Sequence, residues 1–213
     1  MPIVKIPSVE FCSMNIITKE DLKTRIKAAE EEDDYLEIVR KYIFHGIPYV
    51  FHDNQDAYYE FRNRIAKQFK VNFGDVFIVG SAKLGYSYLK GTDFTLDSDI
   101  DVVIVNTDLF NEFHKKICEY QHKLDKGSRT TTKENIEKYH RFLEYMAKGW
   151  MRPDKFPTQF QMEVIKNEWF DFFKSLSYGN SEVGNYKVAG GLYKSYYFLE
   201  KYYIESLKSI KYQ

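Results

Sequence analysis

Apolar residues recur every three or four positions over much of the chain, a spacing that predicts amphipathic helices. Thr18, Asp53 and Thr107 stand where three of these helices would begin, and their side chains cap helices well. The helices expected from this pattern cover 18–29, 35–44, 53–70, 107–124, a stretch ending near 148, 162–176 and 196–210. Most of the chain is therefore expected to be helical.

Three short runs have the pattern of buried β-strands instead. They lie at 75–79, 100–105 and 186–193, and a break without regular structure is expected at 150–157. Few strands among many helices predict an α+β fold, and no repeat or low-complexity linker divides the chain. We therefore expect a single domain over 1–213, with a core at about 53–110, a helical N-terminal extension at 1–52 and a helical C-terminal part at 111–213.

Composition is typical of a globular protein, because 44% of the residues are hydrophobic and 29% are charged. Equal numbers of basic and acidic residues, 31 of each, leave no chain-wide field that would gather nucleic acid or anionic lipid. Cys12 and Cys118 form neither a disulfide framework nor a Cys-x-x-Cys pair, which is typical of a reducing compartment. No apolar run approaches the ~20 residues that span a bilayer. We expect a cytoplasmic protein without a membrane partner.

Two aspartates stand at the start of the second predicted strand. Asp99 and Asp101 are two residues apart, so their side chains point to the same side of an extended strand, whereas 102–105 is apolar enough for burial. Two carboxylates held side by side at the edge of a core repel each other unless a cation compensates. Their hard oxygen ligands suit Mg²⁺ or Mn²⁺. The pair therefore predicts a divalent-metal site.

The first predicted strand ends at Gly80 and Ser81, which predict a phosphate site. A glycine allows close backbone approach, and the helix start expected after it offers free amide groups to phosphate oxygens. Lys83 is expected to add a positive charge near the phosphates. A phosphate site beside a divalent-metal site is the combination that binds a nucleoside triphosphate.

This order of features resembles the signature of the nucleotidyltransferase superfamily of DNA polymerase beta, which is an apolar strand, Gly-Ser, and then Asp-x-Asp on a second strand. The resemblance covers 75–106. It implies a small mixed sheet flanked by helices, with Gly80 and Ser81 at the triphosphate and with Asp99 and Asp101 binding two metal ions. It also implies transfer of a nucleoside monophosphate from the triphosphate to a hydroxyl group, with release of pyrophosphate. The acceptor stays open among nucleic acid, protein and small molecule.

The chain departs from this signature in two ways. The connection at 82–98 is several residues longer than the compact form, so an inserted loop is expected at 85–94. Active members of the superfamily usually add a third carboxylate from a later strand, and the strand predicted at 186–193 contains none. Glu163 and Glu182 are the candidates to replace it.

A second interpretation follows from the missing carboxylate: a catalytically silent module that binds or regulates within a larger assembly, joined to a protein partner through its aromatic-rich helices. A toxin or defence component is also compatible with small members of the superfamily, although no residue supports it. The side chain beside Asp99 separates the interpretations. A third carboxylate within metal-bridging reach there indicates an enzyme, and a void, a lysine or an apolar side chain indicates the module.

Two smaller features complete the expectations. Gly190 and Gly191 predict a bulge or a close backbone approach, because no helix start follows them that would make a second phosphate loop. Arg152 and Lys155, in the expected break, are candidates to reach a phosphate.

Overall fold

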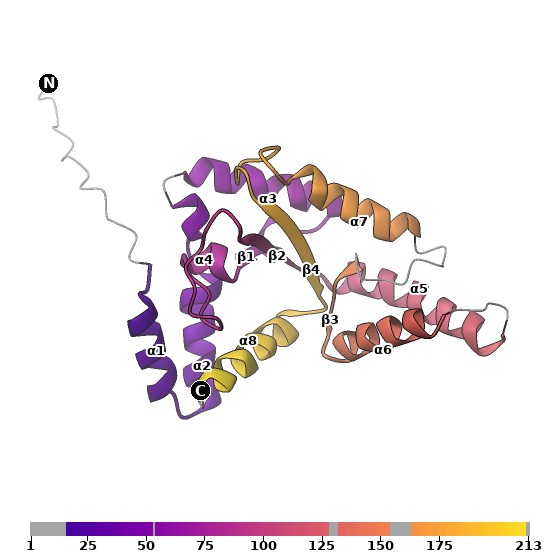
Figure 1. Ribbon diagram of the computed structural model, residues 1–213, viewed down its shortest axis with the longest axis horizontal. Coiled ribbons are helices and arrows are strands. Elements are labelled where there is room, and N and C mark those ends of the chain that lie inside the picture. Colours follow the sequence, from indigo (N-terminus) through magenta and orange to yellow (C-terminus); the bar gives the residue numbers. More distant parts are fainter. Residues whose placement is uncertain (1–15, 53, 128–131, 154–162, 212–213) are drawn as a thin grey trace, which may run out of the picture.

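The computed structural model describes residues 16–52, 54–127, 132–153 and 163–211, and within these ranges helices surround one small β-sheet (Figure 1). The strands are β1 (Val76–Val79), β2 (Asp99–Val105), β3 (Trp150–Met151) and β4 (Lys187–Tyr193). The α-helices are α1 (Lys19–Ala28), α2 (Glu32–Ile38), α3 (Gln55–Phe69), α4 (Ser81–Leu84), α5 (Thr107–Asp125), α6 (Lys133–Ala147), α7 (Glu163–Ser175) and α8 (Tyr196–Lys211). A π-helical turn at Val39–Phe44 continues α2, and 3-10 turns lie at Tyr49–Phe51 and Phe73–Asp75.

The sheet has the strand order β1-β2-β4-β3 and mixes both kinds of pairing. β1 runs antiparallel to β2, and its last residue, Val79, lies opposite Asp101. β4 runs parallel to β2 along all seven residues of each strand. β3 pairs antiparallel with the end of β4 only. The α+β fold with a small mixed sheet is therefore confirmed.

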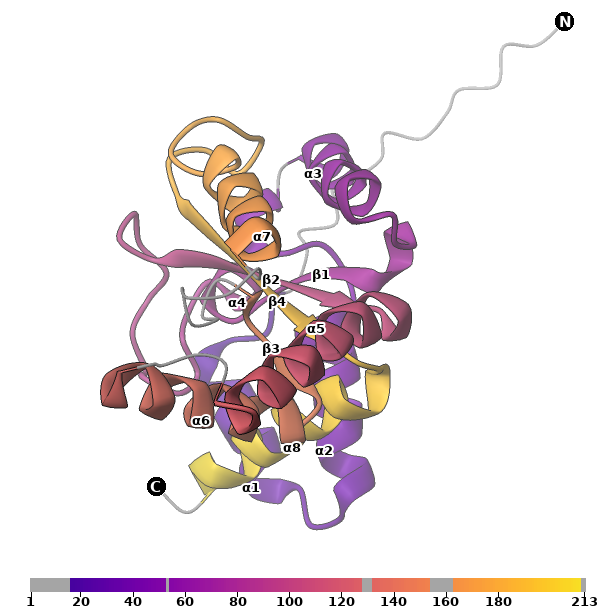
Figure 2. The ribbon, with the colours of Figure 1, turned by 90° about the vertical axis from the view of Figure 1, so that its right-hand side faces the viewer.

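One face of the sheet, which we call the first face, is fully covered. Ile78, Ile100, Val102, Ile104 and Leu192 point to it and belong to a single buried cluster with side chains of α3, α5, α6 and α7. Side-chain alternation puts these residues on one side of their strands. In the turned view, α3 and α7 lie together above the sheet (Figure 2).

The opposite face, which we call the second face, is covered along only part of its length. Val79, Val103, Val105 and Tyr193 pack there in a second buried cluster with side chains of α1, α2 and α8. By the same alternation, Asp99 and Asp101 belong to this face, at the beginning of β2. Both aspartates are exposed, whereas the later residues of β2 are buried. The sequence therefore leaves one polar corner on an otherwise apolar sheet.

One of the three predicted helix caps is confirmed, and the other two helices are capped by a neighbouring residue. Thr18 caps α1 as predicted, because its side chain accepts a hydrogen bond from the Asp21 amide. The predicted cap Asp53 lies outside the described residues, and Asn54 caps α3 through the Ala57 amide. Asn106 caps α5 in place of Thr107, whose hydroxyl donates instead to the Lys194 carbonyl.

Two organisational predictions need correction. The expected break at 150–157 is wrong at its beginning, because Trp150 and Met151 form β3 against the end of β4, while 154–157 lies outside the described residues. A two-residue strand has no sequence period of its own, so only its partner reveals it. The core predicted at about 53–110 is too narrow, because it supplies only β1 and β2 of the four strands.

Gly190 makes the close approach that its sequence predicts. A Cβ atom at this position would lie 2.2 Å from ring carbons of Phe173 on α7, so the helix packs directly on the strand backbone. The Trp169 indole also donates a hydrogen bond of 3.2 Å to the Gly190 carbonyl. At Gly190, α7 therefore covers the first face of β4.

Across the described ranges, no helix combines the length and the apolar character needed to cross a membrane.

Candidate functional site

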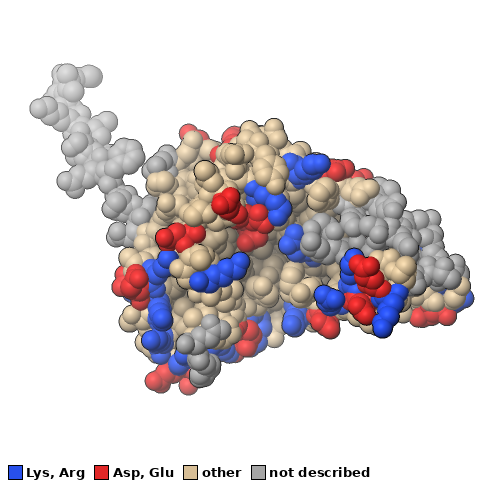
Figure 3. Space-filling view, in the orientation of Figure 1, with Lys and Arg blue, Asp and Glu red and all other residues tan. Residues whose placement is uncertain are grey.

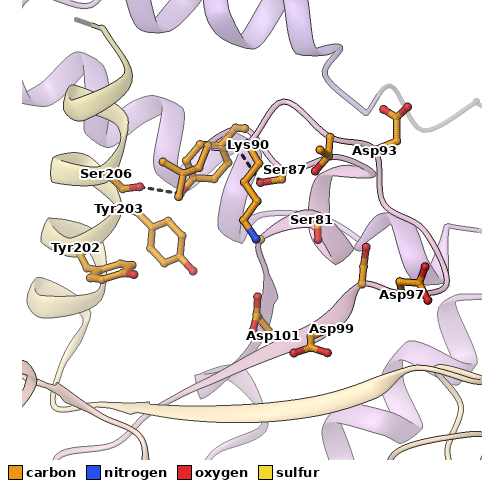
Figure 4. Close-up of a pocket in the computed structure, with 15 residues that line it drawn as sticks. Ser81, Ser87, Lys90, Asp93, Asp97, Asp99, Asp101, Tyr202, Tyr203 and Ser206 are labelled. Atoms are coloured by element: carbon orange, nitrogen blue, oxygen red, sulfur yellow. Dashed lines mark hydrogen bonds between the residues drawn. The ribbon is translucent and has the colours of Figure 1, made fainter. Parts of the chain in front are cut away.

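A cavity of about 470 Å³ lies over the polar corner of the second face (Figure 4). The turn between β1 and α4 contributes Gly80 and Ser81, and the start of β2 contributes Asp99 and Asp101. Side chains of α8 form another wall, which includes Tyr202 and Ser206. The residues predicted to bind phosphate and metal are therefore in one cavity, although 17 residues of chain, 82–98, separate the two pairs.

At Gly80, the turn predicted to bind phosphate lies next to one of the aspartates predicted to bind metal. Its backbone has φ 67° and ψ −146°, a combination that only glycine adopts without strain. A Cβ atom at Gly80 would lie 3.1 Å from Asp101 Oδ2. The glycine therefore serves two needs at once, because it makes the turn into α4 and leaves room for the carboxylate.

The electrostatics of the cavity floor centre on Asp101. Asp101 opens to the cavity, yet the protein atoms around its carboxylate displace water and raise its pKa, and the negative charge of Asp99 adds to the rise. Arg152, Lys187 and Lys90 act in the opposite direction. Arg152 also lines a smaller cavity that shares Asp101 with the main one, while Lys155, the other candidate from the expected break, lies outside the described residues.

β4 places a lysine where a third carboxylate was sought. The parallel register sets Lys187 opposite Asp99 and Ala189 opposite Asp101 on the second face. Lys187 Nζ lies 2.8 Å from Asp99 Oδ2 and forms an ion pair with it. A cation and a methyl group therefore flank the aspartates on this side.

Of the two predicted replacements for that carboxylate, only Glu182 has a described side chain, and it lies elsewhere. Glu182 forms an ion pair of 2.6 Å with Arg64 and is not among the residues that line the main cavity. Glu163 begins α7, and its side chain lies outside what the structure describes. Among the described residues, no three His, Cys, Asp or Glu side chains gather closely enough to hold a metal ion.

The loop expected at 85–94 forms part of the cavity wall and supplies residues that sequence reasoning missed. Tyr86 and Asp93 form an isolated β-bridge across the base of the loop. The Tyr88 hydroxyl lies 3.2 Å from Ser206 Oγ and so links the loop to α8. Lys90 extends from the loop over the aspartates (Figure 4). Only the unusual length of the connection signalled a special role for this segment.

The prediction for Lys83 is wrong in its geometry. Its side chain is buried, and its ammonium group donates hydrogen bonds to the backbone carbonyls of His45 and Gly46, the latter at 2.9 Å. α4 has a single turn, and Lys83 therefore projects away from the cavity toward the end of the π-helical turn. The lysine ties the N-terminal helices to the sheet and does not line the cavity.

This position has a testable pH signature. Burial lowers the pKa of Lys83 from 10.5 to about 8. Below pH 8 Lys83 is charged in the folded and in the unfolded protein, so folding must bury the charge and the free energy of unfolding is lowered. Between pH 8 and 10.5 the folded protein releases the proton first, and the free energy of unfolding therefore rises. The free energy of unfolding of the wild type should rise over this window by roughly 2 to 3 kcal/mol relative to Lys83→Met. Urea unfolding at pH 7.5, 9 and 10.5 measures it, and parallel profiles for the two proteins would contradict the assignment.

Charges of both signs are mixed around the cavity. In the space-filling view, Lys and Arg side chains alternate with Asp and Glu, and no large area of one sign covers the described part of this face (Figure 3). This distribution agrees with the equal numbers of acidic and basic residues. A ligand of this cavity is therefore recognised by local groups and not by a wide field.

The donor set fits a hard divalent cation. Asp99 and Asp101 offer carboxylate oxygens side by side, and their mutual repulsion contributes to the raised pKa of Asp101. Comparisons with protein-family models, with curated proteins and with solved structures find no match for this chain.

Proposed function

We propose that this protein is a metal-dependent nucleotidyltransferase, which moves a nucleoside monophosphate from a nucleoside triphosphate to an acceptor hydroxyl and releases pyrophosphate. The observation that carries the proposal is the close approach of the predicted phosphate-binding turn to the predicted metal-binding pair, where the Gly80 backbone leaves room for the Asp101 carboxylate. A phosphate-binding turn and a metal-binding pair are useful together only at this separation. The like order of motifs in the nucleotidyltransferase superfamily adds support.

Each residue has a defined part in this proposal. Asp99 and Asp101 would hold Mg²⁺ or Mn²⁺, and a cation bound there supplies positive charge to the α-phosphate and to the acceptor oxygen. Gly80 permits close approach of a phosphate group, and the Ser81 hydroxyl donates to a phosphate oxygen. Lys90 replaces Lys83 as the cation nearest the phosphates. Tyr202, which is 41% exposed, presents a ring along the opposite wall, where a nucleobase can stack.

Titration calorimetry with ATP, GTP, CTP and UTP, each with and without Mn²⁺, tests the binding part of the proposal. At least one triphosphate should bind with Mn²⁺ present, and the combined variant Asp99→Asn with Asp101→Asn should lose that binding. If no triphosphate binds, or if the double variant binds as the wild type does, the assignment of the site is wrong.

Replacement of Ser81 by alanine should weaken triphosphate binding more than it slows the reaction. A hydrogen bond to a charged phosphate contributes about 1.5 to 3 kcal/mol, so the Kd should rise about ten- to a hundredfold. Ser175→Ala is the matched control, because the Ser175 hydroxyl donates to the Phe172 carbonyl on α7 and does not line the cavity. Equal Kd values for Ser81→Ala and Ser175→Ala would remove Ser81 from the site.

One observation favours the second candidate function, a catalytically silent module that binds nucleotide within a larger assembly. Lys187 and Ala189 occupy the positions on β4 that face the two aspartates, and neither can activate an acceptor hydroxyl as a carboxylate does. Exposed aromatic side chains, such as Tyr197 on α8 and Phe170 on α7, would give such a module a protein partner. The module binds triphosphate and metal without releasing pyrophosphate, which separates it from the enzyme.

The acceptor and the cellular location stay predictions. Nucleic acid, protein and small molecule all stay open as acceptors, because the residues that line the cavity select none of the three. A cytoplasmic location agrees with the cysteine usage of the sequence.

A further inference from the structure

The ion pair between β2 and β4 lies within the candidate metal site itself. Lys187 faces Asp99 across the parallel register, and its Nζ lies 2.8 Å from Asp99 Oδ2. The side chains of Lys187 and Asp99 are 52% and 44% exposed, so neither is forced into this contact by burial. The ammonium group therefore occupies the β4 side of Asp99 because it is attracted to the carboxylate.

The neighbouring residue of β4 offers no ligand either. Ala189 lies opposite Asp101, and its methyl group cannot coordinate a cation. Within the described ranges, no third His, Cys, Asp or Glu side chain gathers with the two aspartates closely enough to hold a metal ion. Asp99 already shares one of its oxygens with Lys187, which leaves its second oxygen and the Asp101 carboxylate.

The charges near the aspartates set how many cations can bind. Lys187, Arg152 and Lys90 all lie close enough to influence Asp101, so three basic side chains already face two carboxylates. The positive charge of one dication and of these basic side chains is balanced when a triphosphate binds, because the phosphates bring negative charge of their own. Two dications repel each other four times as strongly as two unit charges at the same distance, and the described residues bring no third carboxylate to the aspartates to offset this.

We propose that this site holds one divalent cation, and that the Lys187 ammonium group occupies the place of a second one. This inference rests on the proposed function, since it concerns the same metal and triphosphate. Lys187 is thus a positioning residue, which neutralises Asp99 and supplies a single positive charge on the β4 side of the site. The resemblance described above implies two metal ions, and the donor set on β4 does not fit that number.

Counting bound Mn²⁺ by electron paramagnetic resonance, with a saturating non-hydrolysable ATP analogue, tests the inference on the intact chain. The wild type and Lys187→Arg should each bind one Mn²⁺. Lys187→Glu supplies the missing carboxylate at the same place, and it should bind two, with the Kd of the second ion lowered at least tenfold. A merely structural role for Lys187 would not change the stoichiometry.

The outcomes separate this inference from the proposed function. Two Mn²⁺ ions on the wild type, or a single ion on a folded Lys187→Glu protein, would overturn the inference and leave metal-dependent nucleotide binding intact. Absence of any bound Mn²⁺ on the wild type would overturn the proposed function itself. Thermal unfolding of each variant verifies its fold, which a half-exposed position should preserve.

Discussion

Replacement of Asp101 by asparagine is expected to lower the rate of nucleotidyl transfer by about a thousandfold or more, which corresponds to about 4 kcal/mol of transition-state stabilisation. The asparagine has nearly the same shape and removes only the negative charge. Because the same carboxylate contacts the Gly80 turn and lines the cavity floor, its charge is needed where phosphate and metal meet. Pyrophosphate release in the presence of Mn²⁺ and the triphosphate that binds most tightly measures the effect.

Asp97→Asn is the matched control for this prediction. Asp97 lines the same cavity, yet it belongs to the loop before β2 and lies apart from Asp101 at the rim (Figure 4). Its replacement should change the rate by less than about threefold, because exposed charges contribute little to local energetics. Similar losses in the two variants would show that the cavity responds to overall charge, and the specific role of Asp101 would then be excluded.

The second large effect concerns stability and lies on β4. Gly190→Ala should lower the free energy of unfolding by at least about 3 kcal/mol, because its Cβ atom would lie 2.2 Å from the Phe173 ring and force α7 off the sheet. Phe173 is itself buried in the cluster on the first face, so the ring has little room to move. Urea unfolding at neutral pH measures the change.

Gly191→Ala provides the control for the glycine prediction. The two glycines are adjacent in the same strand, but the nearest atom to a Cβ at Gly191 is the Met151 carbonyl oxygen at 3.9 Å. Alanine therefore fits, and the loss of chain entropy in the unfolded state should leave stability unchanged or raised by less than about 1 kcal/mol. Equal unfolding midpoints for the two variants would contradict the packing of α7 on β4.

Most of the secondary structure can be predicted from local patterns in the sequence. β1, β2 and β4 were predicted because each is a short apolar run, and α1 because Thr18 caps an apolar-periodic stretch. The shared direction of Asp99 and Asp101 follows from the two-residue period of a strand. These features depend on a few neighbouring residues, so a short stretch of sequence is enough to predict them.

Features that depend on distant residues could not be predicted from the sequence. The pairing of Lys187 with Asp99 follows from the parallel register of strands 88 positions apart, which no local pattern encodes. β3 exists only because the end of β4 offers it a partner. The closeness of Lys83 to Gly80 in the sequence predicts a place in the cavity. In the fold, its ammonium group instead donates to backbone carbonyls just after the π-helical turn.

The central claim is the transfer of a nucleoside monophosphate, and triphosphates labelled at the α or the γ position test it most directly. The wild type is incubated with Mn²⁺ and each labelled triphosphate, with total RNA, a tyrosine- and serine-rich peptide mixture, or free nucleosides as separate acceptors. The account predicts α-label on an acceptor and γ-label in pyrophosphate, and neither product with the double variant Asp99→Asn with Asp101→Asn. Release of the γ-label as orthophosphate by pyrophosphatase-free protein, with no α-label transferred, would contradict it.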